Sequence, residues 1–288
     1  MAKLKMSNPE IGHIINAGGV DTNLHDMGPK DIKENIKEGA DNAAVFLHGS
    51  GPGVSAWANW RANLPIISQT RRVIAPDIIG FGYTKRPADN NYNMALWRQH
   101  LLAILDTLEL NEVDLIGNSF GGALALSFAV AHPARVRRLV LMGSGGLDFE
   151  LTKGLDRVWG YQPSAENMQE LLDIFAFNKA LITPELVELR YKASIQPGFQ
   201  ESYGRMFPAP RQEGIRKIAT DEADIRSLKA KTLIIHGQED KVIPVSSSLR
   251  LLALIEGAEL HIFRNCGHWT QIEYAPRFNN LVEGFLSA

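Results

Sequence analysis

The segment that most constrains this chain is Gly-Asn-Ser-Phe-Gly at residues 117–121. It matches G-x-S-x-G, in which a serine occupies a sharp turn between a strand and a helix. The apolar run at 113–116 predicts a buried parallel strand, and the small-residue run at 122–129 predicts a helix. The bare pattern often occurs by chance, but this context indicates a nucleophilic Ser119. The amide of Phe120, at the start of the helix, is then a candidate donor to an oxyanion.

The remaining strand and helix signals alternate along much of the chain. Hydrophobic patterning predicts helices at 57–68, 94–108, 246–255 and 275–286, and strands at 11–16, 20–25, 43–47, 72–75, 113–116, 136–142, 232–236 and 259–263. Such alternation is typical of βαβ units. We therefore predict an α/β fold, with a mostly parallel eight-stranded sheet flanked by helices.

The alternation breaks between residues 147 and 220, where no strand is predicted. Helices are expected at 164–177, with Ser164 as N-cap, and at 183–193, with Thr183 as N-cap. We predict a helical cap (lid) at 147–220 inserted into a core domain formed by 1–146 and 221–288. The alternative is that these helices pack elsewhere on the surface.

A nucleophilic serine needs a base, and the base needs an orienting acid. In proteins that carry the G-x-S-x-G turn between a strand and a helix, the three catalytic residues follow one another along the chain in the order serine, acid, histidine. His268 follows the strand predicted at 259–263, at the edge where ligands bind, so we expect it to be the base. Asp240 follows the preceding strand and is the expected acid, with Glu239 and Asp148 as competitors.

A second oxyanion donor is expected from the loop after the third strand, which here reads His-Gly-Ser-Gly-Pro-Gly at 48–53. The Ser50 amide is the first candidate donor and the Gly51 amide the second. A glycine-rich loop could instead hold phosphate, but neither the Walker A pattern nor GxGxxG is present. His48 is expected to hold the loop.

Composition limits the partners. The formal charge of −2 over 288 residues disfavours nucleic acid and anionic membranes. No apolar run is long enough to span a bilayer, and residues 1–7 lack the apolar region of a signal peptide. Cys266 is the single cysteine, so no internal disulfide can form. We therefore expect a cytoplasmic protein.

With these motifs the chain resembles the α/β-hydrolase family, and within it the meta-cleavage-product hydrolases, which cut a C–C bond in ring-fission products of aromatic catabolism. The matching segments are 48–53, 117–122 and 266–269. Two further tracts, 56–61 and 206–212, resemble the branch that acts on 2-hydroxymuconic semialdehyde and its 6-alkyl homologues. The likeness covers nearly the whole chain.

The resemblance implies further site residues. Arg190 matches the family's cap arginine, which suits binding of a substrate carboxylate. The polar end of the pocket would be lined by Gly51, Asn59, Asn118 and Trp269. Three of them have a plainer alternative: Arg190 as a solvated arginine, Asn118 as a turn residue and Trp269 as a packed residue. Phe175 and Phe177 are left out of the expected site, because aromatic residues at such spacing more often belong to the core.

The resemblance also implies a reaction, hydrolysis of the C5–C6 bond of a small-molecule dienoate, without metal or organic cofactor, by a homo-oligomer (dimer or higher). The nearest rival is a carboxylesterase or lactonase with the same triad. A rival of a different class is a non-catalytic ligand receptor on the same fold. The intact set of Ser119, Asp240 and His268 disfavours the receptor.

Overall fold

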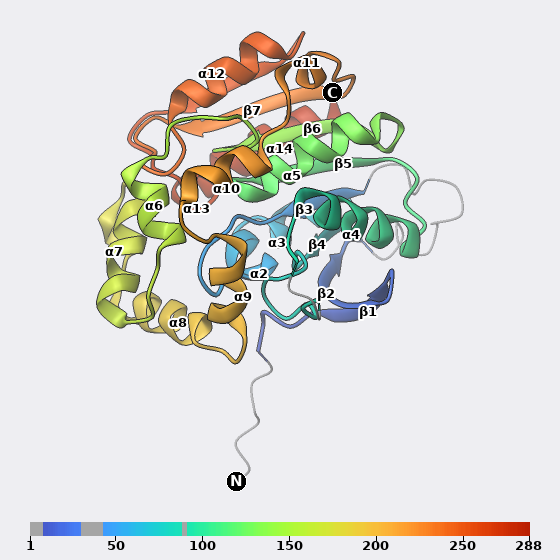
Figure 1. Cartoon of the computed structure of the whole chain (residues 1–288). Coiled ribbons are helices and arrows are strands. Elements are labelled where there is room, and N and C mark those ends of the chain that lie inside the picture. Colours follow the sequence, from blue (N-terminus) through green and yellow to red (C-terminus); the bar gives the residue numbers. More distant parts are fainter. Residues whose placement is uncertain (1–7, 30–42, 88–90) are drawn as a thin grey trace.

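The structure, a computed structural model, describes residues 8–29, 43–87 and 91–288 (Figure 1). Residues 1–7, on which the expectation of no signal peptide rests, lie outside this part. One eight-stranded sheet runs through the described chain in the order β1-β2-β4-β3-β5-β6-β7-β8. Its strands are β1 (His13–Ala17), β2 (Val20–Met27), β3 (Ala44–Leu47), β4 (Val73–Pro76), β5 (Val113–Asn118), β6 (Val136–Met142), β7 (Lys231–Gly237) and β8 (Glu259–Phe263).

Strand β2 pairs antiparallel with β1 and with β4, whereas every pair from β4 to β8 is parallel. The predicted fold class and the eight predicted strands are confirmed. Parallel pairing brings the carboxyl ends of β3, β5, β6, β7 and β8 to one edge of the sheet. The loops that carry the expected site residues follow these strands.

Helices cover both faces of the sheet. Successive residues of β5 point to opposite faces, so Leu115 packs in one core cluster and Ile116 in the other. Helices α4 (Met94–Thr107), α5 (Phe120–Ala131) and α12 (Val245–Leu254) contribute to the Leu115 cluster. Helices α2 (Ala56–Trp60), α3 (Leu64–Ile67) and α14 (Ala275–Ser287) contribute to the Ile116 cluster. Burial on both faces explains why Val113, Leu115 and Ile116 of β5 are all apolar although they alternate between the two faces.

The prediction of one helical stretch at 57–68 is wrong in detail, because the structure breaks it into α2 and α3. The buried Asn63 lies at the break, where its Nδ2 donates to Gln271 O at 3.1 Å and to Asn279 Oδ1 at 2.8 Å. Pro65 lacks an N–H and so cannot continue the hydrogen bonding of α2. The hydrogen bonds of Asn63 at this break therefore connect the α2–α3 segment to α14 and to Gln271, which precedes it.

Residues 147–220 lie between β6 and β7 and contain helices but no strand, as predicted. They form α6 (Lys153–Trp159), α7 (Ala165–Phe175), η3 (Lys179–Leu181), α8 (Pro184–Ser194), α9 (Phe199–Met206) and α10 (Arg211–Ile218), which we call the helical insertion. Figure 1 shows α6, α7 and α8 gathered at the left side of the molecule. Ser164 and Thr183 cap α7 and α8 as expected. Helices α6, α9 and α10 were not predicted; α9 and α10 have no side-chain N-cap, whereas α6 is capped by Thr152.

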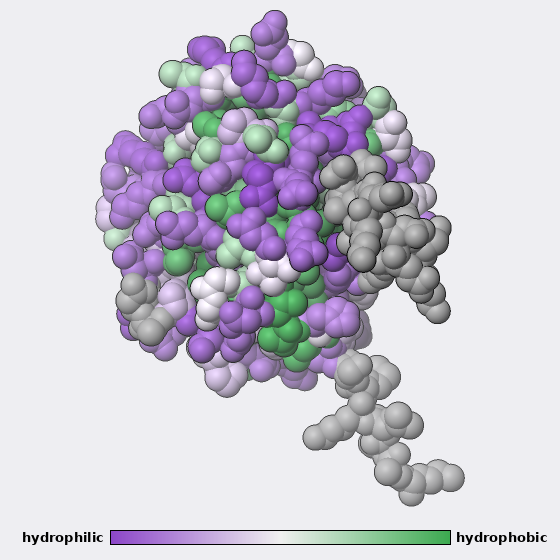
Figure 2. Space-filling view, turned by 90° about the vertical axis from the view of Figure 1, so that its right-hand side faces the viewer, coloured by the Kyte–Doolittle hydropathy of each residue, from purple (hydrophilic) through white to green (hydrophobic). Residues whose placement is uncertain are grey.

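Three short elements complete the described chain: η2 (Pro133–Arg135), α11 (Glu222–Arg226) and α13 (Thr270–Glu273). The face seen in Figure 2 is mainly hydrophilic, with small groups of hydrophobic side chains between the polar ones. Among the described residues, no helix has the length and apolar character needed to cross a membrane.

The turn between β5 and α5 depends on glycine because backbone approaches it closely. A Cβ on Gly121 would lie 2.3 Å from Leu47 O and 2.5 Å from His48 O, in the loop after β3. A Cβ on Gly117 would lie 2.5 Å from Gly121 O. The two glycines of the motif thus let the turn lie against the carboxyl end of β3.

We expect Gly121→Ala to lower the free energy of unfolding by about 3 kcal/mol or more, at the upper end for overpacking, because the clashing atoms belong to backbone. Gly284→Ala in α14 is the matched control. It meets no atom within 4 Å and should stabilise the protein by about 0.4–1 kcal/mol. Thermal and urea unfolding of both variants measure this. If the Gly121→Ala variant were as stable as the wild type, the close approach of the two loops would be contradicted.

Candidate active site

Ser119 occupies the turn with a backbone conformation that side chains rarely adopt, φ 53° and ψ −114°. Such strain costs on the order of 1–3 kcal/mol and persists only where the surroundings impose it. Here the Ser119 amide donates to Met142 O at 2.9 Å, and its carbonyl accepts from the Gly145 amide at 3.0 Å. The bonds hold the residue from the β6 side, while its hydroxyl side chain lines a pocket.

His268 and Asp240 form a close pair. His268 Nδ1 lies 2.7 Å from Asp240 Oδ2, and both side chains are buried. The other carboxylate oxygen, Oδ1, accepts from the amides of Val242 at 2.7 Å and Ile243 at 3.0 Å. An ionised carboxylate only accepts hydrogen bonds, so Nδ1 of His268 carries the proton. Its Nε2 is then left as the basic nitrogen.

A second histidine, His236, supports the acid and was missed by the sequence reasoning. His236 Nε2 lies 3.3 Å from Asp240 Oδ2 and 3.0 Å from Ile243 O, while its Nδ1 lies 2.6 Å from Ser248 Oγ. Burial alone raises the pKa of Asp240, but His268 and His236 together hold that pKa well below its ordinary value. The Asp240 carboxylate therefore stays ionised in the buried site.

The two competing carboxylates point elsewhere. Glu239 Oε2 accepts from the Cys266 amide at 2.9 Å, which supports the loop that carries His268. Asp148 lies at the surface beside Gln212 and Arg216. In the described chain, neither makes a hydrogen bond or ion pair with His268. The geometry therefore favours Asp240.

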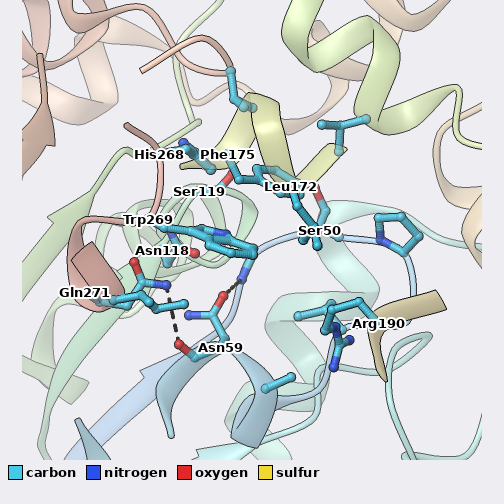
Figure 3. A pocket seen from close by; sticks show the side chains of 18 of the residues that line it. Ser50, Asn59, Asn118, Ser119, Leu172, Phe175, Arg190, His268, Trp269 and Gln271 are labelled. Carbon is cyan, nitrogen blue, oxygen red and sulfur yellow. Dashed lines mark hydrogen bonds between the residues drawn. The ribbon is translucent and has the colours of Figure 1, made fainter. Parts of the chain in front are cut away.

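Ser119 and His268 line the same pocket and lie side by side in Figure 3. Within the described residues, Ser119 Oγ makes no hydrogen bond to His268. Such bonds are often long in unliganded enzymes and shorten when substrate binds. Phe175 O accepts the His268 amide at 2.8 Å, so the helical insertion helps to place the histidine.

The expected oxyanion donors lie at the end of β3 and the start of α5. In the described part of the chain the amides of Ser50 and Phe120 donate no hydrogen bond, so both are free to bind an oxyanion. His48 holds the loop, since its Nε2 accepts from the Ile78 amide at 3.0 Å and its Nδ1 bonds Gly49 O at 2.8 Å. Burial lowers the pKa of His48 to about 4, so it is neutral.

The residues that the family resemblance implies for substrate binding all line this pocket: Gly51, Asn59, Asn118, Arg190 and Trp269. Asn118 Nδ2 donates to Met142 O at 3.3 Å. Asn59 Oδ1 accepts from the Gly49 amide at 3.2 Å, while its Nδ2 has no partner among the described residues. The Nδ2 group of Asn59 is therefore available to donate to a ligand at the polar end of the pocket. Figure 3 shows Asn59 next to Gln271.

Arg190 lies in a buried charge cluster that sequence reasoning did not foresee. Its Nη1 donates to Glu10 Oε1 at 3.0 Å, and its Nη2 donates to Gly53 O. Glu10 Oε2 in turn accepts from Ser55 Oγ at 2.8 Å. A guanidinium has five N–H groups, so three remain after these two contacts. Glu10 precedes β1 and Arg190 belongs to α8, so the pair joins distant parts of the chain.

Arg61 is a second cation at this pocket and was also missed. Its Nη1 donates to Ala58 O at 2.5 Å, and its side chain lines the pocket with Arg190. Burial and the neighbouring charge of Arg190 lower the pKa of Arg61 from its ordinary value. Arg61, Arg190 and Glu10 together carry one net positive charge, which matches a singly charged anion.

The rest of the pocket is mainly apolar, and here leaving out Phe175 was wrong. Phe175 lies 5.3 Å from the Trp269 ring and 5.9 Å from the His268 ring, nearly parallel to both. Phe177 is 45% exposed and does not line the pocket. Half of the other apolar lining residues come from the helical insertion, namely Leu155, Val158, Met168, Leu172 and Leu186. The rest are Pro52, Val54, Ala58, Val242 and Ile272.

Cys266 is adjacent to this site but is unsuited to nucleophilic chemistry. It is buried, and burial raises the pKa of its thiol to about 12. Such a thiol stays protonated at neutral pH. Nowhere in residues 8–29, 43–87 and 91–288 do three or more His, Cys, Asp or Glu side chains form a group that could hold a metal ion.

The strained serine at the β5–α5 turn, together with the strand order, defines the α/β-hydrolase class. A family described as alpha/beta hydrolase fold matches residues 43–275. A 2-hydroxy-6-oxo-2,4-heptadienoate hydrolase from Pseudomonas putida is 55% identical over 98% of this chain and 98% of its own. A 2-hydroxymuconate semialdehyde hydrolase from a Pseudomonas species is also 55% identical, over 98% of this chain and 95% of its own.

A solved structure agrees with these relatives. The meta-cleavage product hydrolase CumD from Pseudomonas fluorescens superposes with a TM-score of 0.92 at 52% identity, covering 97% of this chain and 99% of its own. The chain therefore belongs to the α/β-hydrolase family and, within it, to the meta-cleavage product hydrolases. The resemblance drawn from the motifs is confirmed.

We expect Asp240→Asn to remove a stability contribution that depends on pH. The folded-state pKa of Asp240 lies below its ordinary value of 3.8. Its contribution is therefore present above about pH 4 and is lost as pH falls through the folded-state pKa. The difference in Tm between wild type and variant should be several degrees at pH 7 and should shrink toward pH 3.

Thermal unfolding between pH 3 and pH 8 measures this difference. Asp148→Asn is the control and should change Tm little at any pH, because exposed ion pairs contribute only about 0–1 kcal/mol. A constant Tm difference for Asp240→Asn across the range would show that its contacts do not favour the ionised form.

Proposed function

We propose that this protein hydrolyses the C5–C6 bond of 2-hydroxy-6-oxo-2,4-dienoates, namely 2-hydroxymuconic semialdehyde and its 6-alkyl homologues, in the meta-cleavage degradation of aromatic compounds. The observation that carries the proposal is that Arg190 lines the same pocket as Ser119 and His268 but lies apart from them (Figure 3). Such a pocket suits a substrate with a carboxylate at one end and a ketone or aldehyde at the other. The names of the most similar relatives support this assignment.

The proposed reaction begins when the dienol tautomerises to its keto form. Ser119 then attacks the C6 carbonyl while His268 Nε2 takes its proton, and the amides of Ser50 and Phe120 stabilise the oxyanion. The C5–C6 bond breaks, the electron pair passes into the conjugated enolate, and the enolate oxygen on C2 takes a proton. Water then releases the acyl group from Ser119 as formate, acetate or isobutyrate. The other product is 2-hydroxypenta-2,4-dienoate.

Another route to the same products remains open. In it, His268 acts as a general base on water and a gem-diol forms at C6 without an acyl-enzyme. Both routes use Asp240 to hold the tautomer of His268. They differ in whether C6 is ever bonded to Ser119 Oγ.

The helical insertion serves as a cap (lid) in this proposal. Residues 147–220 supply Arg190 and half of the apolar lining residues, while 1–146 and 221–288 supply Ser119, Asp240 and His268. The substrate is a small molecule and the reaction needs neither metal nor organic cofactor. We also propose a cytoplasmic homo-oligomer with no role for nucleic acid or membrane.

The first test is the loss of dienoate absorbance with substrates that carry hydrogen, methyl, isopropyl or phenyl at C6. We expect kcat/KM for the alkyl substrates to exceed that for phenyl at least about tenfold, since overpacking an apolar pocket costs about 1–3 kcal/mol.

Ser119→Ala should lower turnover by several orders of magnitude while substrate still binds. Turnover of p-nitrophenyl acetate without dienoate turnover would favour an esterase or lactonase. No turnover of either would favour a receptor.

We expect Arg190→Gln to lower kcat/KM for dienoates by about 10- to 100-fold, because a charge-assisted hydrogen bond contributes about 1.5–3 kcal/mol. Neutral esters should lose far less. Steady-state kinetics on both substrates measure the difference. The single variant leaves Glu10 without its cation, so Glu10→Gln/Arg190→Gln is the matched control. Dienoate turnover restored in the double variant would contradict carboxylate binding by Arg190, since the isolated Glu10 would explain the loss.

A further inference from the structure

Two aromatic residues of the helical insertion bind the loop that carries Ser50. Trp159, at the end of α6, donates from Nε1 to Ser50 Oγ at 3.0 Å. The hydroxyl of Tyr203, in α9, lies 3.3 Å from Ser50 O and 2.9 Å from Val158 O. All of these side chains are buried. The insertion thus contacts both the side chain and the carbonyl of one residue in the loop after β3.

Trp159 and Tyr203 also contact Phe207, whose ring in turn contacts the ring of Phe120. Trp159 stacks on Phe207 with ring centres 4.5 Å apart and planes 10° apart. Phe207 meets the Phe120 ring edge-on at 6.1 Å, and Tyr203 lies 5.3 Å from Phe207. Phe120 carries the other amide of the proposed oxyanion hole. One buried cluster therefore contacts both residues whose amides would bind the oxyanion.

These contacts act on the direction of peptide groups. Trp159 holds the Ser50 side chain and Tyr203 holds the Ser50 carbonyl, so two of the groups on the Ser50 Cα are fixed, and with them the direction of its own N–H. The Gly51 amide shares one planar peptide unit with the Ser50 carbonyl, so its direction is fixed as well. An indole N–H is only a donor, so Ser50 Oγ must accept from Trp159, which fixes its rotamer. Ser50 also lines the pocket. Oxyanion donors work only when they lie about 2.7–3.1 Å from the developing charge.

We propose that Trp159 and Tyr203 are positioning residues that hold Ser50 in the orientation in which its amide N–H points at the oxyanion. The helical insertion thereby completes the oxyanion hole as well as enclosing the substrate. The inference rests on the proposed function, because that function assigns the Ser50 amide to the oxyanion. Neither positioning residue touches the reacting atoms.

The test compares Trp159→Phe and Tyr203→Phe with Tyr161→Phe. Each variant keeps an aromatic ring and removes one polar group. Tyr161 is the control because it is buried in the same insertion and its hydroxyl bonds Ser194 Oγ at 3.0 Å, with no hydrogen bond to Ser50 among the described residues. Thermal unfolding establishes that the three variants are folded and lose similar stability.

We expect Trp159→Phe and Tyr203→Phe to lower kcat roughly tenfold, with KM within about twofold of wild type, less than the 10²–10³-fold loss on deleting an oxyanion donor. Inhibition by a phenylboronic acid, which forms a tetrahedral adduct with a serine, should weaken in proportion. Tyr161→Phe should change neither quantity by more than about twofold. An effect confined to KM, or an equal effect in Tyr161→Phe, would overturn the proposal.

The measurements use p-nitrophenyl acetate as well as a dienoate. Ester hydrolysis also passes through an oxyanion, so it reports on the positioning residues whatever the natural substrate is. Loss of ester kcat in the two positioning variants alone supports the inference. A wild-type protein that turns over the ester but no dienoate would refute the proposed function and leave this inference intact. If Trp159→Phe fails to fold, Tyr203→Phe decides the outcome.

Discussion

The geometry of the site depends on how closely the turn between β5 and α5 approaches the loop after β3. Gly121 has no room for a Cβ against the carbonyls of Leu47 and His48. This approach brings the amides of Ser50 and Phe120 to the same edge of the sheet as Ser119. Any side chain at that point would separate the two loops. The backbone strain at Ser119 is tolerated because the surrounding hydrogen bonds maintain the same approach.

Much of this could be predicted from the sequence, because the strands are apolar runs and the site loops follow them in a fixed order. Ser119, Asp240 and His268 were placed in this way, and the structure brings Asp240 to His268. Glu10 could not be predicted, because it is one carboxylate among many and its partner lies 180 residues away. The fold class and the family are confirmed. The catalytic roles and the cap boundaries stay predictions.

The two ends of the pocket carry opposite charge. At one end, the Asp240 carboxylate bonds His268 and is held ionised by its buried partners. At the other end, Arg61 and Arg190 exceed Glu10 by one positive charge. Apolar side chains of the helical insertion line the same pocket, and a less polar environment strengthens both interactions. A monoanionic substrate would complete the charge balance of the second end.

The state of Cys266 has a practical consequence for spectroscopy. It is the single cysteine of the chain, it is buried, and its thiol stays protonated near neutral pH. Maleimide reagents need an accessible thiolate, so they would discriminate strongly against it. A cysteine placed at the exposed Leu189 of α8 would therefore be labelled selectively. A fluorophore there would report movement of the helical insertion in an otherwise unaltered protein.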